Sequence, residues 1–129
     1  MDMKLELVPI PVTDVDRAKA FYAEQLGFVV DVDVRPAEGI RVVQLTPPGS
    51  ACSIGLGTGI PVYEAPPGSV RGLHLVVNDI EKARAELVGR GVDVGAVEDL
   101  GGVRYAAFED PDGNGLTLQE MPWRTGDAF

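Results

Sequence analysis

The side chain best suited to chemistry in this sequence is His74, the one histidine of the chain. An imidazole titrates close to neutral pH, so His74 could act as a general acid or base, or it could bind a ligand. A lone histidine in an apolar run such as GLHLVV can equally be a hydrogen-bonded core residue. The residues alone leave these interpretations open. If the protein is an enzyme, we predict His74 as its catalytic residue.

Two other features have the residue types of a reactive or metal-binding site. Cys52 is the single cysteine, which excludes an intrachain disulfide, and on a strand it is more typical of a small buried hydrophobe than of a nucleophile. The run Asp110-Pro111-Asp112-Gly113 is acidic like a calcium loop, but the remaining ligands of an EF-hand are missing. We interpret this run as a plain turn.

The charge of the chain limits its partners. Its 20 acidic and 11 basic residues give a formal net charge of −9. Such a chain is a poor candidate for nucleic acid, because phosphate contacts need Lys and Arg, and anionic membrane surfaces would repel it. There is no apolar run of the roughly 20 residues that span a bilayer, and no signal-peptide pattern at the start. We expect a cytoplasmic protein without nucleic-acid or membrane partners; the charge fits either a cationic ligand or simple solubility.

Hydrophobic periodicity predicts the elements that position these residues. A strand is expected at residues 4–12, and Asp14 then caps an amphipathic helix that ends at Gly27. Further strands are expected at 28–35, 40–46 and 51–56. After a stretch rich in turn formers, the order recurs with a strand at 72–77, a helix between Asp79 and Gly91, and strands at 92–97, 103–108 and 115–121.

The second half of the chain repeats the first. Val12-Thr13-Asp14-Val15 matches Val77-Asn78-Asp79-Ile80 at an offset of 65 residues, and both helices end at a glycine. This pattern indicates duplication of one βαβββ unit. We therefore predict a single domain with unit one at about 3–58, a linker at about 59–70, unit two at about 71–121 and a tail at 122–129. One such unit leaves a sheet face exposed, and two units can close that face into a cleft.

Two motifs resemble one known family. The run VTDVDRAKAFYAEQLGF is similar to the signature of the vicinal oxygen chelate superfamily, which includes glyoxalases, bleomycin-resistance proteins and extradiol dioxygenases, and FEDPDGNGLTLQE resembles that family's last hairpin. The resemblance covers about residues 4 to 121. It implies an α+β fold in which two tandem βαβββ units form a cleft between concave mixed β-sheets, with the helices outside. It also implies a homodimer.

The resemblance also indicates where a metal would bind. Members with a metal place ligands on the first and last strand of each unit, and these positions fall on Leu7, Gly72, Thr117 and, give or take one residue, Ile54. Leucine and glycine side chains have no donor atoms, whereas a catalytic divalent site needs about three N, O or S ligands. We therefore expect no metal and no cofactor. A rearranged site through Cys52, His74 and Gln119 is the alternative, which is geometrically demanding.

Strand alternation extends the candidate site. If Gly72 and Thr117 face the cleft, then His74 and Gln119 face it too, while Leu5 and Pro9 join Leu7 in an apolar floor. Desolvation there would favour a neutral imidazole, and Glu120 should point away as a solvated charge. Tyr63 is a candidate for stacking on a planar ligand or for anchoring a dimer. The predicted ligand-binding residues are Leu7, Cys52, Ile54, Tyr63, His74, Thr117 and Gln119.

These residues favour one function and leave others open. We predict a glyoxalase/bleomycin-resistance-like protein that binds a small organic molecule in a metal-free cleft and sequesters an antibiotic or metabolite. The alternative is a metal-independent isomerase, lyase or cyclase that uses His74 as general acid or base. A metal-dependent lyase or dioxygenase is disfavoured by the ligand positions, and a structural or regulatory dimer module remains a further alternative.

Overall fold

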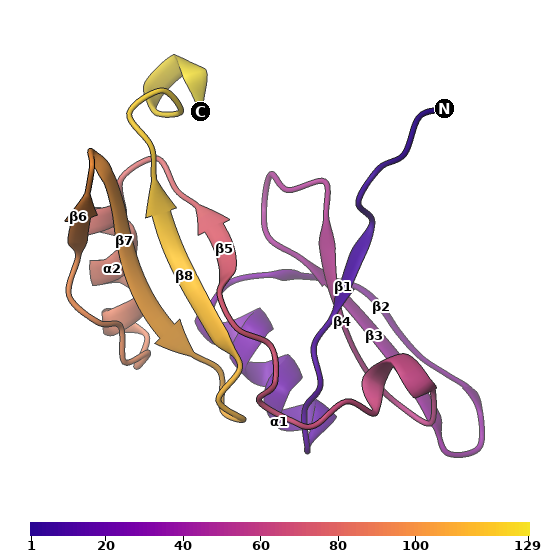
Figure 1. Ribbon diagram of the computed structural model, residues 1–129. Helices are drawn as coiled ribbons and strands as arrows, with labels where there is room; N and C mark the ends of the chain where they lie inside the picture. The colour runs from indigo at the N-terminus through magenta and orange to yellow at the C-terminus, as the bar shows by residue number, and fades with distance from the viewer. The chain divides into compact units, whose positions relative to one another are not determined.

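The computed structural model describes residues 1–129 as two compact units, Met1–Ser69 and Val70–Phe129. Each unit runs in the order strand, helix and three strands (Figure 1). The α+β fold with two βαβββ units, predicted from the duplicated motif, is confirmed. Neither helix has the length and apolar character needed to cross a membrane.

The elements of the two units correspond one to one. Unit one contains β1 (Leu7–Pro9), α1 (Val15–Ala20) continued by a π-helical turn (Phe21–Gln25), β2 (Val29–Ala37), β3 (Ile40–Thr46), β4 (Ser53–Thr58) and a 3-10 turn (Pro61–Tyr63). Unit two contains β5 (Leu73–Val76), α2 (Ile80–Gly89), β6 (Glu98–Leu100), β7 (Val103–Glu109), β8 (Gly115–Glu120) and a 3-10 turn (Gly126–Ala128).

Both sheets have the same topology. Their strand orders are β1-β4-β3-β2 and β5-β8-β7-β6, so the first strand of each unit lies beside the last. That pair is parallel and the other neighbours are antiparallel. The edge position of β1 agrees with its residue Pro9, which cannot donate a ladder hydrogen bond.

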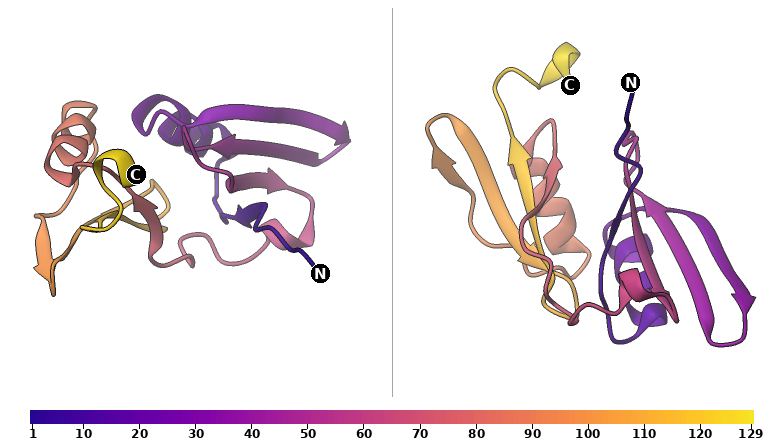
Figure 2. Two further views of the ribbon diagram at one scale, coloured as in Figure 1. Left: turned by 90° about the horizontal axis from the view of Figure 1, so that it is seen from above. Right: turned by 45° about the vertical axis from the view of Figure 1, so that its right-hand side comes forward.

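Each helix starts and ends as the sequence predicts. The carboxylate of Asp14 accepts the backbone N–H of Arg17 at 3.1 Å, and Asp79 accepts that of Lys82 at 3.1 Å. Past the helical segments, Gly27 and Gly91 take positive φ angles of 78° and 86°, which only glycine adopts readily. Each helix lies on one side of its own sheet (Figure 2).

The core of each unit lies between its helix and one sheet face. In unit one the buried apolar residues include Ile10, Ala18, Tyr22, Val43, Leu45, Ile54 and Leu56. In unit two they include Ile80, Val92, Val94, Ala106, Phe108, Leu116 and Leu118. Phe21 and Tyr22 are buried, and their rings are in edge-to-face contact with centroids 5.1 Å apart.

Two predicted strands differ from the structure. The strand expected at 4–12 is limited to Leu7–Pro9, and Leu5 is 72% exposed. The strand expected at 92–97 is wrong: Val92 and Val94 are buried, but the segment is not a strand and β6 begins at Glu98. The reason is that the Arg84 guanidinium donates to the carbonyls of Val94 and Gly95, at 2.9 and 2.6 Å, which takes those acceptors from a sheet ladder.

Candidate functional site

Each sheet has one face packed against its helix, and we call the other its open face. Along β8, Leu116 and Leu118 are buried on the helix side, whereas Thr117 and Gln119 alternate with them. Along β4, Ile54 and Leu56 are buried opposite Leu45 and Val43 of β3. Side chains available to a ligand therefore belong to the open faces.

On the open face of unit two, the structure brings His74, Thr117 and Gln119 together. His74 is paired with Thr117 across the parallel strands, and Gln119 is paired with Tyr105 of β7. The rings of His74 and Tyr105 meet edge to face, with centroids 6.2 Å apart. Residues paired across a sheet point to the same side, so these four side chains form one surface.

The hydrogen bond of His74 defines its chemistry. Its Nδ1 lies 2.5 Å from the carbonyl oxygen of Gly72, which can only accept, so Nδ1 carries the proton. In the neutral ring, Nε2 is then the acceptor. The His74 side chain is exposed in the structure. This arrangement leaves Nε2 able to accept a proton or a ligand hydrogen bond.

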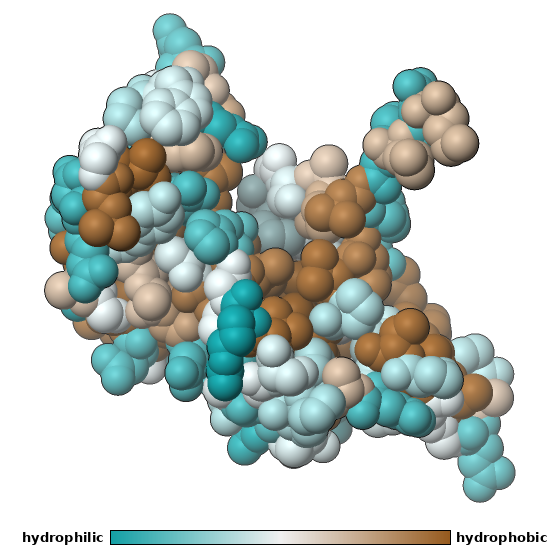
Figure 3. Space-filling model, viewed as in Figure 1, coloured by the Kyte–Doolittle hydropathy of each residue, from teal (hydrophilic) through white to brown (hydrophobic).

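On the open face of unit one, Tyr63 lies over a glycine surface. A Cβ atom on Gly55 would be 2.8 Å from the Tyr63 hydroxyl, and one on Gly57 would be 2.7 Å from the ring. The Leu7 side chain borders the same glycine, within 3.1 Å of that Gly55 position. Only glycine lets the Tyr63 ring approach the strand backbone so closely. Burial also raises the pKa of the Tyr63 phenol. Hydrophobic side chains gather over β1 and the strand beside it (Figure 3).

Next to this apolar surface runs a chain of hydrogen-bonded polar side chains, which we call the polar chain. The Gln44 amide Nε2 donates to Ser53 Oγ at 3.1 Å, Ser53 and Thr46 share a hydrogen bond of 2.6 Å, and Thr46 donates to the Asp31 carboxylate. Ser53 pairs with Leu7 in the parallel register, so the polar chain and Leu7 lie on the same face.

A β-bulge places Asp31 there. The register of β2 against β3 shifts between Val30 and Val32, so Asp31 lies on the open face and Asp33 on the helix face. Asp33 accepts from Arg41 at 3.0 Å and from Lys19 at 2.7 Å, and these hydrogen bonds hold the pKa of its carboxyl well below its usual range. The two aspartates therefore have different surroundings although they are two positions apart.

Two predicted ligand-binding residues lie away from these surfaces. Ile54 is 3% exposed on the helix face, which corrects its placement in the cleft. The repeat shows which residue takes its place. Pro9 corresponds to His74, and Pro9 pairs with Gly55 just as His74 pairs with Thr117. Gly55, next to Ile54, is therefore the counterpart of Thr117. Cys52 precedes β4, partly buried, with its thiol 3.6 Å from the Ser53 carbonyl.

Glu120 has a structural role that the sequence did not indicate. It lies on the helix side, as its position in the alternation predicts, and its Oε1 accepts the backbone N–H of Ile80 at 2.9 Å. Its other oxygen is 3.6 Å from Arg104. The expectation of a merely solvated charge is therefore corrected: Glu120 satisfies a free N–H at the start of α2.

The residues at the family's metal positions do not fit a divalent ion. Leu7, Gly72 and Gly55 have no donor side chain, and Thr117 alone offers a hydroxyl. Gly72 has a φ of 70°, so the backbone there also disfavours any liganding side chain. No group of three or more His, Cys, Asp or Glu side chains is arranged to hold a metal ion.

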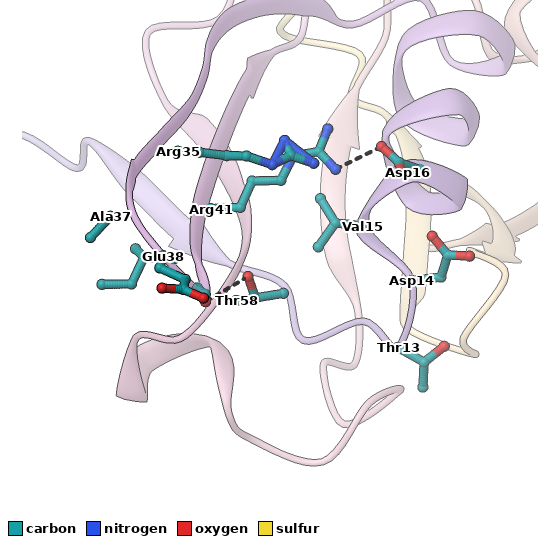
Figure 4. A pocket seen from close by; sticks show the side chains of 11 residues that line it. Thr13, Asp14, Val15, Asp16, Arg35, Ala37, Glu38, Arg41 and Thr58 are labelled. Carbon is teal, nitrogen blue, oxygen red and sulfur yellow. Dashed lines mark hydrogen bonds and ion pairs between the residues drawn. The ribbon is translucent and has the colours of Figure 1, made fainter.

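A depression in unit one lies elsewhere, on the helix side. It has a volume of about 840 Å³ between the start of α1 and the turn joining β2 to β3 (Figure 4). Arg41 in its wall bonds to Asp16 at 2.6 Å and to Asp33, which also bonds to Lys19, so two cations neutralise two carboxylates. None of the predicted ligand-binding residues lines it. We interpret it as the surface of a structural ion-pair network.

Sequence reasoning missed Gln44, Thr46, Ser53 and Tyr105 as open-face residues. Strand alternation could have found Gln44 and Thr46, because they alternate with the buried Arg41, Val43 and Leu45. The polar chain itself had no sequence signal, since it depends on the register of β2, β3 and β4.

Comparisons with known proteins agree with the fold of two βαβββ units. Residues 4–118 match the Glyoxalase/Bleomycin resistance protein/Dioxygenase superfamily. No curated protein matches the sequence. Among solved structures, TnmS3, an antibiotic binding protein from Streptomyces sp. CB03234, is 37% identical with a TM-score of 0.82, over 93% of this chain and 97% of that chain.

Two further structures are similar over most of their length. A glyoxalase/bleomycin resistance protein from the same Streptomyces strain is 38% identical, with a TM-score of 0.76 over 89% of this chain and 98% of that chain. A superfamily member from Sphaerobacter thermophilus DSM 20745 is 33% identical, with a TM-score of 0.79 over 92% and 98%.

Proposed function

Because the chain belongs to the Glyoxalase/Bleomycin resistance protein/Dioxygenase superfamily, we propose that it binds and sequesters a small organic molecule, such as an antibiotic, without a metal. The observation that carries this proposal is the open face of unit one, where Tyr63 lies over Gly55 and Gly57 beside the polar chain. The similarity to an antibiotic binding protein supports the same ligand class.

The chemistry of that face suits binding. Sites for small organic molecules combine apolar surface with a few placed polar groups. Leu7 and the Tyr63 ring supply the apolar part, and Gln44 and Thr46 supply polar groups that are only half-buried. On unit two, Gln119 and the Nε2 atom of His74 offer further hydrogen bonds. That both open faces line one cleft stays a prediction.

Native mass spectrometry and thermal shift test the proposal. The protein as purified, and after incubation with a panel of natural-product antibiotics, should retain a bound small molecule. A ligand at 100 times its Kd should stabilise the fold by about 2.7 kcal/mol. Gly55→Val, which intrudes on Tyr63 and Leu7, should abolish the shift, whereas Gly89→Ala, which adds a methyl group in open space on α2, should preserve it. Absence of any bound molecule or shift across the panel would contradict the proposal.

A metal-independent enzyme is the second candidate, favoured by the hydrogen bond that fixes the proton on Nδ1 of His74. A general base needs a free acceptor nitrogen, which Nε2 provides. For any ligand found, mass spectrometry should then detect its conversion. His74→Gln should leave binding intact and reduce turnover by about 10² to 10⁴. Conversion at the wild-type rate by this variant would eliminate His74 as the base.

We also propose that the protein is a homodimer. The open side of edge strand β2 carries Val29, Val32 and Val34, whose side chains are 55%, 36% and 48% exposed. Solvent-exposed apolar rows of this kind mark interaction surfaces in soluble proteins. Light scattering should give the mass of a dimer at micromolar concentration, and a monomer mass would refute the proposal.

A further inference from the structure

We propose that the polar chain of unit one is an ordered acceptor site that recognises a protonated amine on the bound molecule. The inference rests on the proposed binding function and adds the chemical class of the ligand. Its basis is the direction of the hydrogen bonds from Gln44 to Asp31, which fixes where each proton lies.

The proton order follows from counting donors. A carboxylate only accepts, so the single hydroxyl proton of Thr46 is directed at Asp31. Thr46 must then accept at its contact with Ser53, so the Ser53 hydroxyl is the donor across their 2.6 Å separation. Ser53 in turn accepts from the amide of Gln44 at 3.1 Å. Neither hydroxyl therefore has a proton left to donate to a ligand.

The polar chain presents mainly hydrogen-bond acceptors to a ligand. The exposed Asp31 carboxylate, the half-buried Thr46 hydroxyl oxygen and the Oε1 atom of Gln44 are acceptors, whereas Ser53 is 4% exposed and serves as the internal link. The remaining amide N–H of Gln44 is the only donor in the set. A ligand group with several donors and no acceptors fits best, and an ammonium group has that composition.

The charge at Asp31 points to the same group. Asp33, on the opposite face of the strand, is neutralised by Lys19 and Arg41, whereas Asp31 forms no ion pair and its partner is the Thr46 hydroxyl. A cationic group on the ligand would neutralise the Asp31 carboxylate, and charge-assisted hydrogen bonds are stronger than neutral ones. The neighbouring Leu7 and Tyr63 would hold the apolar part of the same molecule.

Two naphthalene probes of similar shape test the inference. 1-Naphthylmethylamine is cationic at neutral pH and 1-naphthalenemethanol is neutral, and NMR titration of the backbone amides gives the affinity and position of each. The amine should bind about three- to tenfold more tightly, with shifts at Gly55, Gly57 and Ser53, and this preference should shrink as salt is added.

Two variants with the same change of charge separate the local site from the net charge. Asp31→Asn removes the charge on the open face and permits the reversed proton order, so the preference for the amine should fall to about one. Asp33→Asn on the opposite face should retain it. If Asp33→Asn folds poorly, Asp93→Asn at an exposed position of unit two is the substitute control.

The outcomes distinguish the two proposals. Equal binding of both probes at the open face of wild-type protein, or an unchanged preference in Asp31→Asn, overturns the inference and leaves the binding function intact. A preference lost equally in the control variant shows an effect of net charge and also overturns it. If neither probe shifts Gly55 or Gly57, both the inference and the proposed function of this face fail.

Discussion

Asn114 should be one of the most sensitive positions of unit two, because its side chain joins the last turn to the start of β5. Its Nδ2 donates to Asp110 Oδ2 at 2.8 Å, and its Oδ1 accepts the backbone N–H of Val70 at 3.1 Å. Asn114 is 1% exposed, so water cannot easily replace these bonds. The parallel pair of β5 and β8, which carries His74 and Thr117, begins at this junction.

The magnitude follows from the two bonds. A net hydrogen bond to a charged carboxylate contributes roughly 1.5–3 kcal/mol and a neutral one about 1 kcal/mol, so Asn114→Ala should destabilise the protein by about 3 kcal/mol. That is a large fraction of the roughly 5–15 kcal/mol that stabilises a typical domain. For a chain of this size the melting temperature should fall by about 10 °C.

Calorimetry or circular dichroism melting measures this change, and two further variants interpret it. Asn78→Ala removes an exposed 2.7 Å bond to Gly126 N in the tail and should cost under about 1 kcal/mol. Asn114→Asp keeps the shape but sets a second carboxylate against Asp110, so it should be at least as unstable as Asn114→Ala. A melting temperature within about 2 °C of wild type for either Asn114 variant would refute the reasoning.

Three other outcomes are expected. The hydrogen bond from Arg41 holds the pKa of Asp33 below its ordinary 3.8, so the ionised carboxylate stabilises the fold fully above about pH 4, and this stabilisation is lost as the pH falls further. Asp33→Asn should therefore flatten the decline of the free energy of unfolding in acid. An equally steep decline in the variant would contradict this. Gly55→Ala should displace Tyr63 and lower the pKa of its phenol toward the ordinary 10.0, seen by ultraviolet titration, whereas an unmoved phenol would show that the ring adapts in place. Nitrogen-15 NMR of neutral His74 should show a protonated Nδ1 and a bare Nε2; the reverse tautomer would break the argument for a free acceptor.

Much of the scaffold could be predicted from the sequence because its determinants are local. The caps at Asp14 and Asp79 and the glycine stops act within one helical turn, and the alternation along β8 is enough to put Thr117 and Gln119 on the same face. The same counting brought His74 to that face, although it could not indicate that the imidazole is exposed.

The features that could not be predicted depend on contacts distant in sequence. Strict alternation of VVDVDV would put Asp31 and Asp33 on one face, and only the bulge against β3 separates them. The position of Tyr63 depends on a segment that folds back over Gly55 and Gly57. The loss of the strand at 92–97 depends on Arg84, which reaches the segment from α2.

The open faces of the two units differ more in chemical type than their helix sides do. Equivalent helix-side positions stay apolar in both units, as Ile54 corresponds to Leu116 and Leu56 to Leu118, because each must fill a core against a helix. The open-face positions between them have diverged in chemical type: Gly55 corresponds to Thr117, and Gly57 to Gln119. Packing against the helix does not constrain these side chains, because they lie on the opposite face of the sheet. The glycines of unit one make room for Tyr63, whereas the equivalent positions of unit two carry polar side chains that can form hydrogen bonds. Sites for small organic molecules combine apolar surface with a few polar groups, so each open face has part of the chemistry that such a site needs.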